Sequence, residues 1–417
     1  MKLLISTKSI HTLSIQKTFP LFLLLLLISA CAPSKRFTEY KESATKDFAQ
    51  EVRVLLNELN VDLTIGTDTY LISENVKLAI IKSGNKFSAE AIHNKIFIKL
   101  GSKRFNSKEF YLQSVDDSLI IINSKKYRGR IKLLNVDGAI KIINQISLED
   151  YIKGVMTKEM PVGKGKENFE ALKAFAIAAR TYAINKIFAS KTYYDLLPDI
   201  RDQVYGGADA EHPLSNKAVD ETKGLILTFE DDPAIVFYHS TCGGYTESSV
   251  NVFTMDDISY LRTISDGNDP FCSISPNFNW TEIIPESIFI KRLFDAKLLK
   301  DTNCILERFN IKSRFQSGRI KELEILLKYD DEIKSISIFG NQIRSVIKNN
   351  SGNGLLKSNN FIIEITDDRK VMITGKGAGH GVGMCQWGAI GQSKLGKNYK
   401  EILMQYFPET EIKSLNG

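Results

Sequence analysis

The sequence lacks the patterns by which several protein classes are recognised. Its 417 residues contain no arginine-rich patch and no alternation of aromatic and basic residues, so nothing in it indicates nucleic-acid binding. It has no internal repeat and no low-complexity segment, so a repeat architecture is not expected. Cysteine is scarce, with five residues, and no two are spaced C-x-x-C, the pattern that predicts zinc most strongly. What remains is the composition of an ordinary globular protein, 43% hydrophobic and 25% charged.

The charge balance is only mildly basic. The chain carries 55 lysines and arginines against 49 acidic residues, a net charge of +6 that is spread along its length. A weakly basic surface suits a polyanionic neighbour such as a cell-wall polymer.

The N-terminus resembles an export signal. Three lysines precede a continuous apolar run, residues 21–28, which is too short to span a membrane. The run ends in I-S-A-C, similar to the bacterial lipobox, in which the cysteine is acylated and becomes the new N-terminus. We therefore expect residues 1–31 to be a lipoprotein signal peptide with Cys31 as the lipidation site. The polar residues 32–50 would form the tether of an exported protein that is anchored to a membrane and faces the cell wall or periplasm.

Four cysteines remain in the exported part: Cys242, Cys272, Cys304 and Cys385. The segment H-S-T-C places His239 three residues before Cys242, so these two could bind a structural zinc with Cys272 as a third ligand. A disulfide between Cys242 and Cys272 explains the same residues equally well, because exported proteins fold in an oxidising compartment. The sequence leaves both interpretations open and indicates no other cofactor.

The hydrophobic pattern predicts an α+β fold. The expected parts are a β-rich part (51–146), a core with two main helices (147–282), an inserted subdomain rich in Lys and Ile (283–350), and a glycine-rich motif with a C-terminal helix (351–417). Asn398 and Glu401 have the spacing of a capping box, which predicts that the last helix begins there.

A carboxylate lies on the apolar face of the first expected helix. This helix begins with a capping box, Ser147 and Asp150, and its apolar residues follow the i, i+3, i+4 pattern. Glu159 continues that stripe near the end of the helix, just before Pro161. Loss of water and the negative end of the helix dipole both raise the pKa of a carboxyl group there, as a general acid requires. A frayed helix end would instead turn Glu159 to solvent.

The second helix, residues 170–184, is apolar on nearly every side and should be buried. Lys173 and Arg180 nevertheless lie seven residues apart on one face of it. A buried arginine needs a partner, and the Glu159 carboxylate on the preceding helix is available to pair with Arg180. The same residues fit a lysine that reaches solvent and an arginine paired elsewhere.

Two loops supply further candidates for a sugar-binding cleft. The polar loop D-Q-V-Y-G-G contains Gln203 and Tyr205, residue types that commonly contact sugars. The run T-G-K-G-A-G-H-G-V-G-M-C-Q-W-G, residues 374–388, matches no nucleotide-binding pattern. Its glycines would let a polysaccharide approach the backbone, while His380, Gln386 and Trp387 would supply hydrogen bonds and a stacking face.

Five segments, in this order, resemble the SpoIID/LytB family, named for the stage II sporulation protein D and for a modifier of wall amidases. They are S-L-E-D-Y-I-K-G-V-M-T-K-E-M-P, E-A-L-K-A-F-A-I-A-A-R-T-Y-A, D-Q-V-Y-G-G, F-Y-H-S-T-C-G-G-Y-T-E and G-A-G-H-G-V-G-M-C-Q-W-G-A. The resemblance covers almost everything after residue 51. The link between the first two segments, V-G-K-G-K-E-N-F, is slightly longer than is typical of the family.

The resemblance implies a protein that acts on peptidoglycan glycan strands outside the cytoplasm. In the sporulation branch the activity is that of a lytic transglycosylase acting on strands stripped of their stem peptides. The acid of the E-M-P motif, here Glu159, is the catalytic residue of that branch, and Arg180 matches an arginine implicated at the site. Lys173, Gln203, Tyr205, His380, Gln386 and Trp387 are expected to bind substrate. Some members bind zinc near the H-S-T-C segment.

Two other functions fit the same sequence. The second family name implies a non-catalytic module that binds glycan and stimulates a wall amidase, which would then be a partner. A zinc hydrolase centred on His239, Cys242 and Cys272 is the other alternative. Cleavage by a single acid favours the transglycosylase, because common glycoside hydrolases need two carboxylates.

Overall fold

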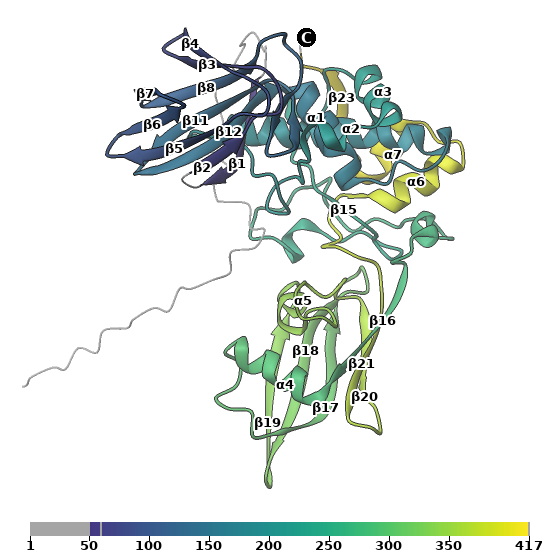
Figure 1. Ribbon diagram of the computed structural model, residues 1–417. Helices are drawn as coiled ribbons and strands as arrows, with labels where there is room; N and C mark the ends of the chain where they lie inside the picture. Colours follow the sequence, from purple (N-terminus) through teal and green to yellow (C-terminus); the bar gives the residue numbers. More distant parts are fainter. Residues whose placement is uncertain (1–50, 59–60, 416–417) are drawn as a thin grey trace, which may run out of the picture.

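The computed structural model describes residues 51–58 and 61–415, and the expected signal peptide, Cys31 and the tether lie outside this range. The fold is α+β, as the sequence predicted, and it consists of a β-rich unit, a helical core and a second β-rich unit that extends away from the core (Figure 1). No helix in the described part of the chain is long and apolar enough to cross a membrane.

The N-terminal β-rich unit contains two antiparallel sheets with a shared apolar core. The six-stranded sheet has the order β1-β12-β11-β8-β3-β4 and the four-stranded sheet the order β2-β5-β6-β7, with a β9–β10 hairpin beside them. The strands are β1 (Glu51–Glu58), β2 (Val61–Thr64), β3 (Thr69–Ser73), β4 (Val76–Ile81), β5 (Lys86–Ile92), β6 (Lys95–Leu100), β7 (Lys103–Ser107), β8 (Glu109–Ser114), β9 (Ile120–Ile122), β10 (Lys125–Tyr127), β11 (Arg130–Val136) and β12 (Ala139–Ser147). Alternation explains the packing: every second residue of β11 is buried.

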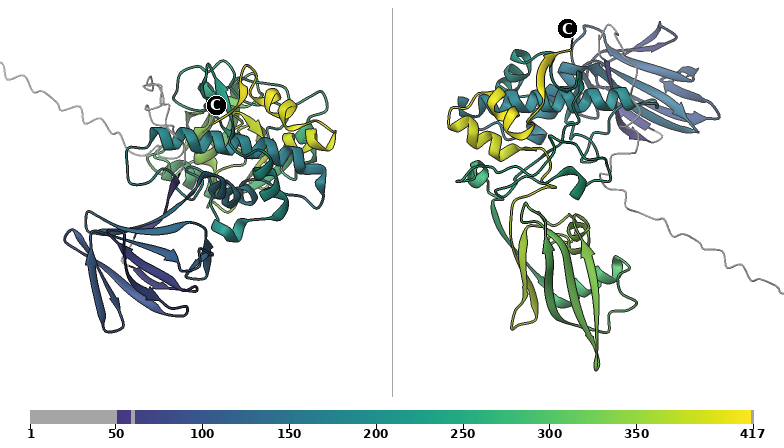
Figure 2. Two further views of the ribbon diagram at one scale, coloured as in Figure 1. Left: turned by 90° about the horizontal axis from the view of Figure 1, so that it is seen from above. Right: turned by 180° about the vertical axis from the view of Figure 1, so that it is seen from behind.

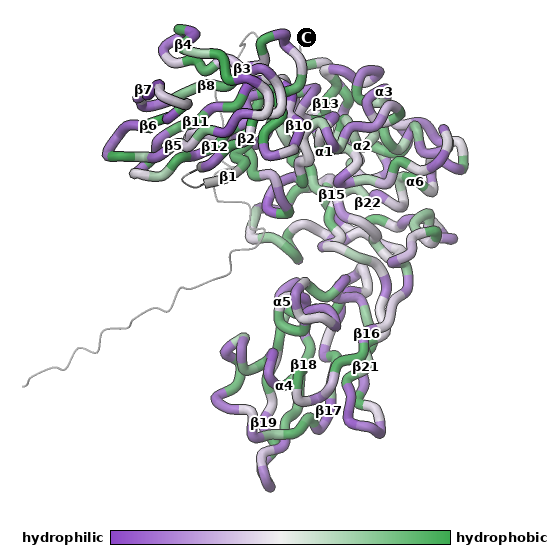
Figure 3. Tube along the Cα trace, viewed as in Figure 1, coloured by the Kyte–Doolittle hydropathy of each residue, from purple (hydrophilic) through white to green (hydrophobic). Residues whose placement is uncertain are grey.

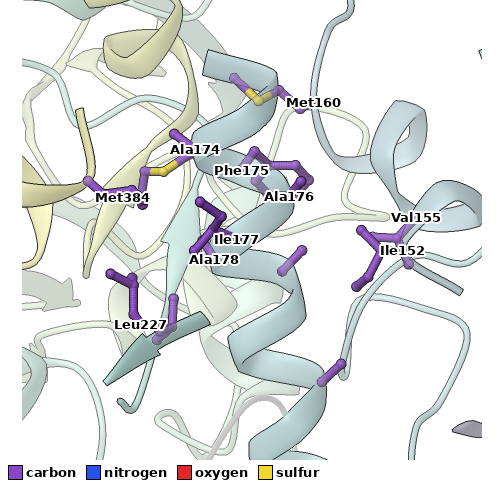
Figure 4. Packing of buried hydrophobic residues seen from close by; sticks show 14 of the residues in the cluster. Ile152, Val155, Met160, Ala174, Phe175, Ala176, Ile177, Ala178, Leu227 and Met384 are labelled. Carbon is purple, nitrogen blue, oxygen red and sulfur yellow. The ribbon is translucent and has the colours of Figure 1, made fainter. Parts of the chain in front are cut away.

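The helical core is built around α2 (Phe169–Ala189), which is buried among the other helices (Figure 2). The surrounding elements are α1 (Leu148–Glu159), α3 (Pro213–Glu221), α6 (Gln386–Lys394) and α7 (Tyr399–Tyr406), with short 3-10 turns η1 (Lys166–Asn168), η2 (Gly207–Ala210), η3 (Ser249–Asn251) and η4 (Phe271–Ile274). In Figure 4, side chains of α2 lie between Ile152 and Val155 of α1 and residues Leu227 and Met384 from later strands. This packing explains why α2 carries apolar residues around nearly its whole circumference.

Short strands complete the core and join distant parts of the chain. One small sheet has the order β14-β13-β23, and β15 pairs in parallel with β22. These strands are β13 (Leu225–Phe229), β14 (Asp232–Pro233), β15 (Tyr238–His239), β22 (Met384–Cys385) and β23 (Glu411–Ser414). The β15–β22 pair brings the H-S-T-C segment beside the glycine-rich run.

The second β-rich unit is larger than the expected insertion of residues 283–350. It begins with β16, which pairs with β21, and therefore extends from residue 279 to 376. Its elements are β16 (Asn279–Pro285), α4 (Glu286–Asp295), β17 (Ile305–Arg314), β18 (Ile320–Tyr329), β19 (Glu332–Phe339), α5 (Gln342–Ile347), β20 (Phe361–Ile365) and β21 (Lys370–Lys376), around a separate apolar core. The turn between β18 and β19 is hydrophilic (Figure 3). The boundary expected at residue 350 falls inside this unit because β21, the strand that pairs with β16, lies later in the chain, at Lys370–Lys376.

The expected helix starts are confirmed at two caps. The Ser147 side chain accepts a hydrogen bond from the Asp150 N–H at the start of α1. Asn398 and Glu401 form the capping box at the start of α7. Both caps satisfy backbone N–H groups that have no partner inside the helix.

Candidate active site

A cavity of about 250 Å³ opens at the C-terminal end of α1. It is lined by Glu159, Tyr182, Asn185, Lys186, Ile200, Arg201, Asp202, Val204, Ile235, Val236, Phe237, Tyr238, Phe253 and His380. The cavity combines an acid, aromatic rings and other polar groups, which is the usual composition of a small ligand site.

Glu159 is the half-buried acid of this cavity. It is the last residue of α1, and one of its carboxylate oxygens, Oε1, accepts a hydrogen bond from the Val204 N–H at 2.6 Å. Burial raises the pKa of the Glu159 carboxyl above its ordinary value of 4.5, and the Val204 N–H offsets part of this rise. The helix does not turn Glu159 out to solvent, and the carboxyl is disposed to hold a proton.

The D-Q-V-Y-G-G loop contributes Asp202 and Val204 to the cavity lining, whereas Gln203 and Tyr205 do not line it. Gln203 is fully buried, accepts a hydrogen bond from the Tyr151 hydroxyl at 3.1 Å and donates one to the Tyr238 hydroxyl at 3.1 Å. Tyr205 stacks on Tyr151 and donates to Asn144 at 2.7 Å. Gln203 and Tyr205 were expected to contact substrate, but neither side chain lines the cavity, and both are hydrogen-bonded to neighbouring side chains.

Asp202, from the same loop, is a second carboxylate of the cavity. Its Oδ1 atom accepts from Lys186 Nζ at 2.6 Å and from the Tyr182 hydroxyl at 3.1 Å. Its Oδ2 atom accepts from the Leu197 N–H at 2.8 Å. Both oxygens are thus held by donors, including one cation, which ties Asp202 to the wall of the cavity.

Tyr238 is a cavity residue that the sequence did not identify. It lies in β15 and is half-buried, and its hydroxyl oxygen accepts from Gln203, so its own O–H can donate to another group. Burial, and next the charge of Glu159, raise the pKa of Tyr238 well above 10, which keeps the phenol protonated. A tyrosine at the end of an apolar strand is as typical of a core as of a site, so the pattern could not single it out.

His380 lines the cavity, and both of its ring nitrogens are hydrogen-bonded. Its Nδ1 atom accepts from the Val382 N–H at 3.1 Å, and its Nε2–H donates to the Tyr238 carbonyl at 2.9 Å. Burial lowers the pKa of His380 to about 3, so the ring is neutral. The Nε2 bond joins the glycine-rich run to β15, and the Nδ1 bond closes a turn within the run.

The glycines of residues 374–388 pack against the protein itself. At Gly381 (φ +92°) a β-carbon would lie 2.5 Å from the Arg319 guanidinium carbon, and at Gly383 (φ +70°) 2.1 Å from the Phe237 carbonyl oxygen. Space that was expected to admit a polysaccharide is therefore filled by the chain. The glycines serve close packing behind the cavity.

Gln386 and Trp387 lie in α6 and do not line the cavity. Gln386 is 6% exposed, and the Trp387 ring packs against the helical core while its backbone N–H donates to the Ser240 carbonyl at 3.1 Å. The sequence predicted that both residues contact substrate from a loop, whereas the chain enters helix α6 directly after Cys385 and Trp387 packs on the core.

Arg180 does not pair with Glu159. The fully buried guanidinium donates two hydrogen bonds to Glu149, Nε to Oε1 at 2.9 Å and Nη2 to Oε2 at 2.7 Å, and further ones to main-chain carbonyls. Lys173 pairs with Glu221 at 2.7 Å and with Glu170 at 3.1 Å. The expected Glu159–Arg180 pair is wrong, because Arg180 faces the start of α1 and Glu159 lies at its end. Neither basic residue lines the cavity.

Behind the cavity wall lies a cluster of thiols. The ligand atoms of Cys242, Asp266, Cys272 and Cys385 all lie within 4.8 Å of one another, and the four residues are buried. The sulfurs of Cys242 and Cys272 are 3.4 Å apart and are not bonded, so the structure contains no disulfide between them. His239 is not part of the cluster: its Nδ1–H donates to the Val382 carbonyl at 3.1 Å. The cluster therefore joins two of the expected ligands, Cys242 and Cys272, to Asp266 and Cys385, and it leaves out His239.

A larger cavity of about 660 Å³ lies at the other end of α1. Polar and charged residues of the N-terminal β-rich unit line it, together with Ser147 and Asp150 at the start of the helix. Two of its acids face arginines: Glu51 lies 3.4 Å from Arg130 and Asp150 lies 3.9 Å from Arg128, and such a neighbour favours the charged carboxylate. Size alone therefore does not make it the better candidate for acid catalysis.

Comparison with known proteins identifies two regions of the chain. Residues 136–229 match the family described as stage II sporulation protein, and residues 273–383 match a domain of unknown function (DUF8618). An uncharacterized protein of Brachyspira hyodysenteriae is 28% identical over 88% of this chain and 93% of its own length. The amidase enhancer of Bacillus subtilis is 30% identical over 63% of this chain but only 40% of its own length. The stage II sporulation protein D of Bacillus subtilis is 29% identical over 65% of this chain and 75% of its own length.

Proposed function

Because the chain belongs to the SpoIID/LytB family, we propose that it is a peptidoglycan lytic transglycosylase in which Glu159 is the catalytic acid and base. One observation carries the proposal. A half-buried carboxyl group with a raised pKa lines the cavity, and a backbone N–H holds it in place. The substrate would be the glycan strand, most simply one without stem peptides, since the cavity of about 250 Å³ is small.

The reaction needs one carboxyl group in two protonation states. Protonated Glu159 donates its proton to the glycosidic oxygen as the bond between this oxygen and the muramyl C1 breaks. The 6-hydroxyl oxygen of the same sugar then bonds to C1, and its proton passes to the Glu159 carboxylate. The products are a free 4-hydroxyl end and a 1,6-anhydro-N-acetylmuramic acid end, and Glu159 is returned to its protonated form. Tyr238, with an O–H available in the cavity, is placed to donate a hydrogen bond to the sugar or to the carboxylate.

The second acid of the cavity supports this reaction over hydrolysis. A hydrolase needs a second carboxylate to activate water or attack C1. Asp202 is bound to Lys186, Tyr182 and the Leu197 N–H, so its oxygens are already committed. Intramolecular attack by the substrate's own hydroxyl removes the need for a second base.

The test is incubation of the full-length chain with amidase-treated peptidoglycan, followed by mass spectrometry of the soluble products. The proposal requires fragments one water lighter than the hydrolytic products. Hydrolytic products would contradict the single-acid reaction. Binding to the glycan without any release would favour the alternative that the name of one relative suggests, an enhancer of a wall amidase. That alternative also requires that the chain raises the rate of an added amidase.

The raised pKa of Glu159 predicts the pH dependence. A general acid must be protonated, so kcat/KM should fall as pH rises through the pKa of Glu159, and the apparent pKa of this alkaline limb should lie above 4.5.

The stability of the folded protein should also decrease as pH rises through the pKa of Glu159. The folded state holds this proton more tightly than the unfolded chain, so its contribution is present at low pH and is lost as pH rises toward the folded pKa. Glu159→Gln should therefore gain stability relative to the wild type as pH rises from 4.5 through the folded pKa of Glu159, measured by thermal unfolding. A constant difference across this range would contradict the assignment.

We also propose that Cys31 anchors the protein to a membrane, with the domains facing the cell wall or periplasm. The apolar run followed by I-S-A-C supports this. Cells grown with an alkyne-labelled fatty acid should label the wild-type protein, and Cys31→Ala should reduce the label to background. Cys304→Ala is the matched control and should keep the label. Undiminished labelling of Cys31→Ala would exclude this anchor.

A further inference from the structure

The cluster of Cys242, Asp266, Cys272 and Cys385 has the composition of a metal site. Each residue is fully buried, and three chain segments contribute: the loop after β15 (Cys242), η4 with the loop before it (Cys272 and Asp266), and the residue that caps α6 (Cys385). We propose that the cluster is a structural zinc site with three thiolate ligands and one carboxylate ligand.

The spacing fits a tetrahedral ion. With a Zn–S bond of about 2.3 Å, the sulfurs of a tetrahedral site lie roughly 3.8 Å apart. The Cys242 and Cys272 sulfurs are 3.4 Å apart, and all four ligand atoms lie within 4.8 Å of one another. Changes of up to about 1 Å in these separations would therefore suffice to place the ion. Thiolate-rich tetrahedral sites favour zinc over magnesium or calcium, which prefer oxygen ligands.

The hydrogen bonds around the cluster are those expected to orient metal ligands. The Cys385 sulfur accepts from the backbone N–H groups of Cys242 and Gly388, both at 3.2 Å. The Asp266 carboxylate accepts from the Tyr406 hydroxyl at 2.7 Å and from the Cys272 N–H at 2.8 Å. Such outer partners fix the direction of a ligand before the metal binds.

The negative charge of the four ligand groups also favours a bound cation. Three thiolates and a carboxylate carry four negative charges, which are costly to bury without compensation. One basic side chain, Arg319, packs beside the cluster, and its guanidinium is fully buried. It donates to the main-chain carbonyls of Cys242 at 3.0 Å and Tyr245 at 3.1 Å, so it does not take a ligand atom from the site. A zinc ion and Arg319 together would balance three of the four charges.

The position of the cluster gives the ion a structural role. Four protein ligands and full burial leave no open coordination position for substrate, which is typical of structural zinc. Cys242 follows Tyr238 by four residues and Cys385 follows His380 by five, and these two cavity residues come from the segments joined by the β15–β22 pair. Zinc would thus hold the rear wall of the cavity together.

Metal analysis of the full-length chain, purified without chelator, tests the site. We expect about one zinc per chain in the wild type, and a loss of at least tenfold in Cys385→Ser. Cys304→Ser is the matched control, since Cys304 lies in the second β-rich unit outside the cluster, and it should keep its zinc. Cys385→Ser should also unfold at a lower temperature than Cys304→Ser.

Three results would overturn the proposal. The first is a wild type without zinc whose intact mass is lower by two hydrogens, since this would mean a disulfide. The second is undiminished zinc in Cys385→Ser. The third is a histidine nitrogen bound to the zinc of the wild-type protein, measured by X-ray absorption. The proposed site should instead show three sulfur ligands at about 2.3 Å and one oxygen. This measurement needs no variant, so it also decides the case in which Cys385→Ser fails to fold.

Discussion

Replacing Glu159 with glutamine is expected to lower the release of anhydromuramyl products by about 100- to 10,000-fold, the range typical of losing a general acid and base. Glutamine has the same shape, and its carbonyl oxygen can still accept the Val204 N–H that Glu159 accepts at 2.6 Å. It cannot donate a proton to the glycosidic oxygen or take one from the 6-hydroxyl. The measurement is the rate of soluble product formation from amidase-treated peptidoglycan at saturating substrate.

The control for this variant is Glu167→Gln, which makes the same chemical change at an exposed glutamate outside the cavity. It should retain the wild-type rate. Both variants should sediment with the glycan as well as the wild type does, because binding does not require the proton. If Glu159→Gln, folded as judged by its thermal unfolding, still releases anhydromuramyl products at the wild-type rate, Glu159 is not the catalytic residue.

Replacing Arg180 with methionine is expected to destabilise the helical core by about 3–5 kcal/mol, the usual cost of removing one partner of a buried ion pair. Arg180 is 0% exposed and forms a bidentate ion pair with Glu149. Without Arg180, the Glu149 carboxylate would keep the hydrogen bond that it accepts from the Gly224 N–H at 3.1 Å. The measurement is the thermal or denaturant transition of the core, followed separately from the two β-rich units.

A double variant separates the ion pair from other effects of the substitution. Glu149→Gln combined with Arg180→Met removes both charges and should recover part of the lost stability. Lys173→Met is the comparison on the same helix. Its ammonium group is only partly buried, so the loss should not exceed about 1 kcal/mol. A stable Arg180→Met protein that has lost activity would instead place Arg180 in the chemistry of the site.

Sequence periodicity was sufficient for the elements that depend on local physics. The stripe of α1 and the all-round apolar surface of α2 follow from helical spacing, and the caps at Ser147 and Asn398 follow from side chains that bond their own backbone. The position of Glu159 at the buried end of α1 follows from the same spacing, and burial raises its pKa as expected.

Other assignments failed because periodicity gives the face of an element and not its neighbour. Arg180 was correctly expected to be buried with a carboxylate, but the packing of α2 on α1 brings it to Glu149 at the start of α1 and not to Glu159 at its end. Gln386 and Trp387 were placed on a loop, although helix α6 begins at Gln386. The glycine-rich run was interpreted as an open wall of a sugar-binding cleft, whereas Arg319 and Phe237 occupy the space beside its backbone.

The sequence by itself determined the class of fold, the two main helices and the acid, because each depends on residues within a few turns of one another. Only the tertiary structure decided what surrounds that acid. Val204 donates to Glu159 from 45 residues later in the chain, Tyr238 lines the same cavity from β15, and Cys385 joins Cys242 across 143 residues. Such contacts are fixed by how sheets and helices pack, and no local spacing encodes them.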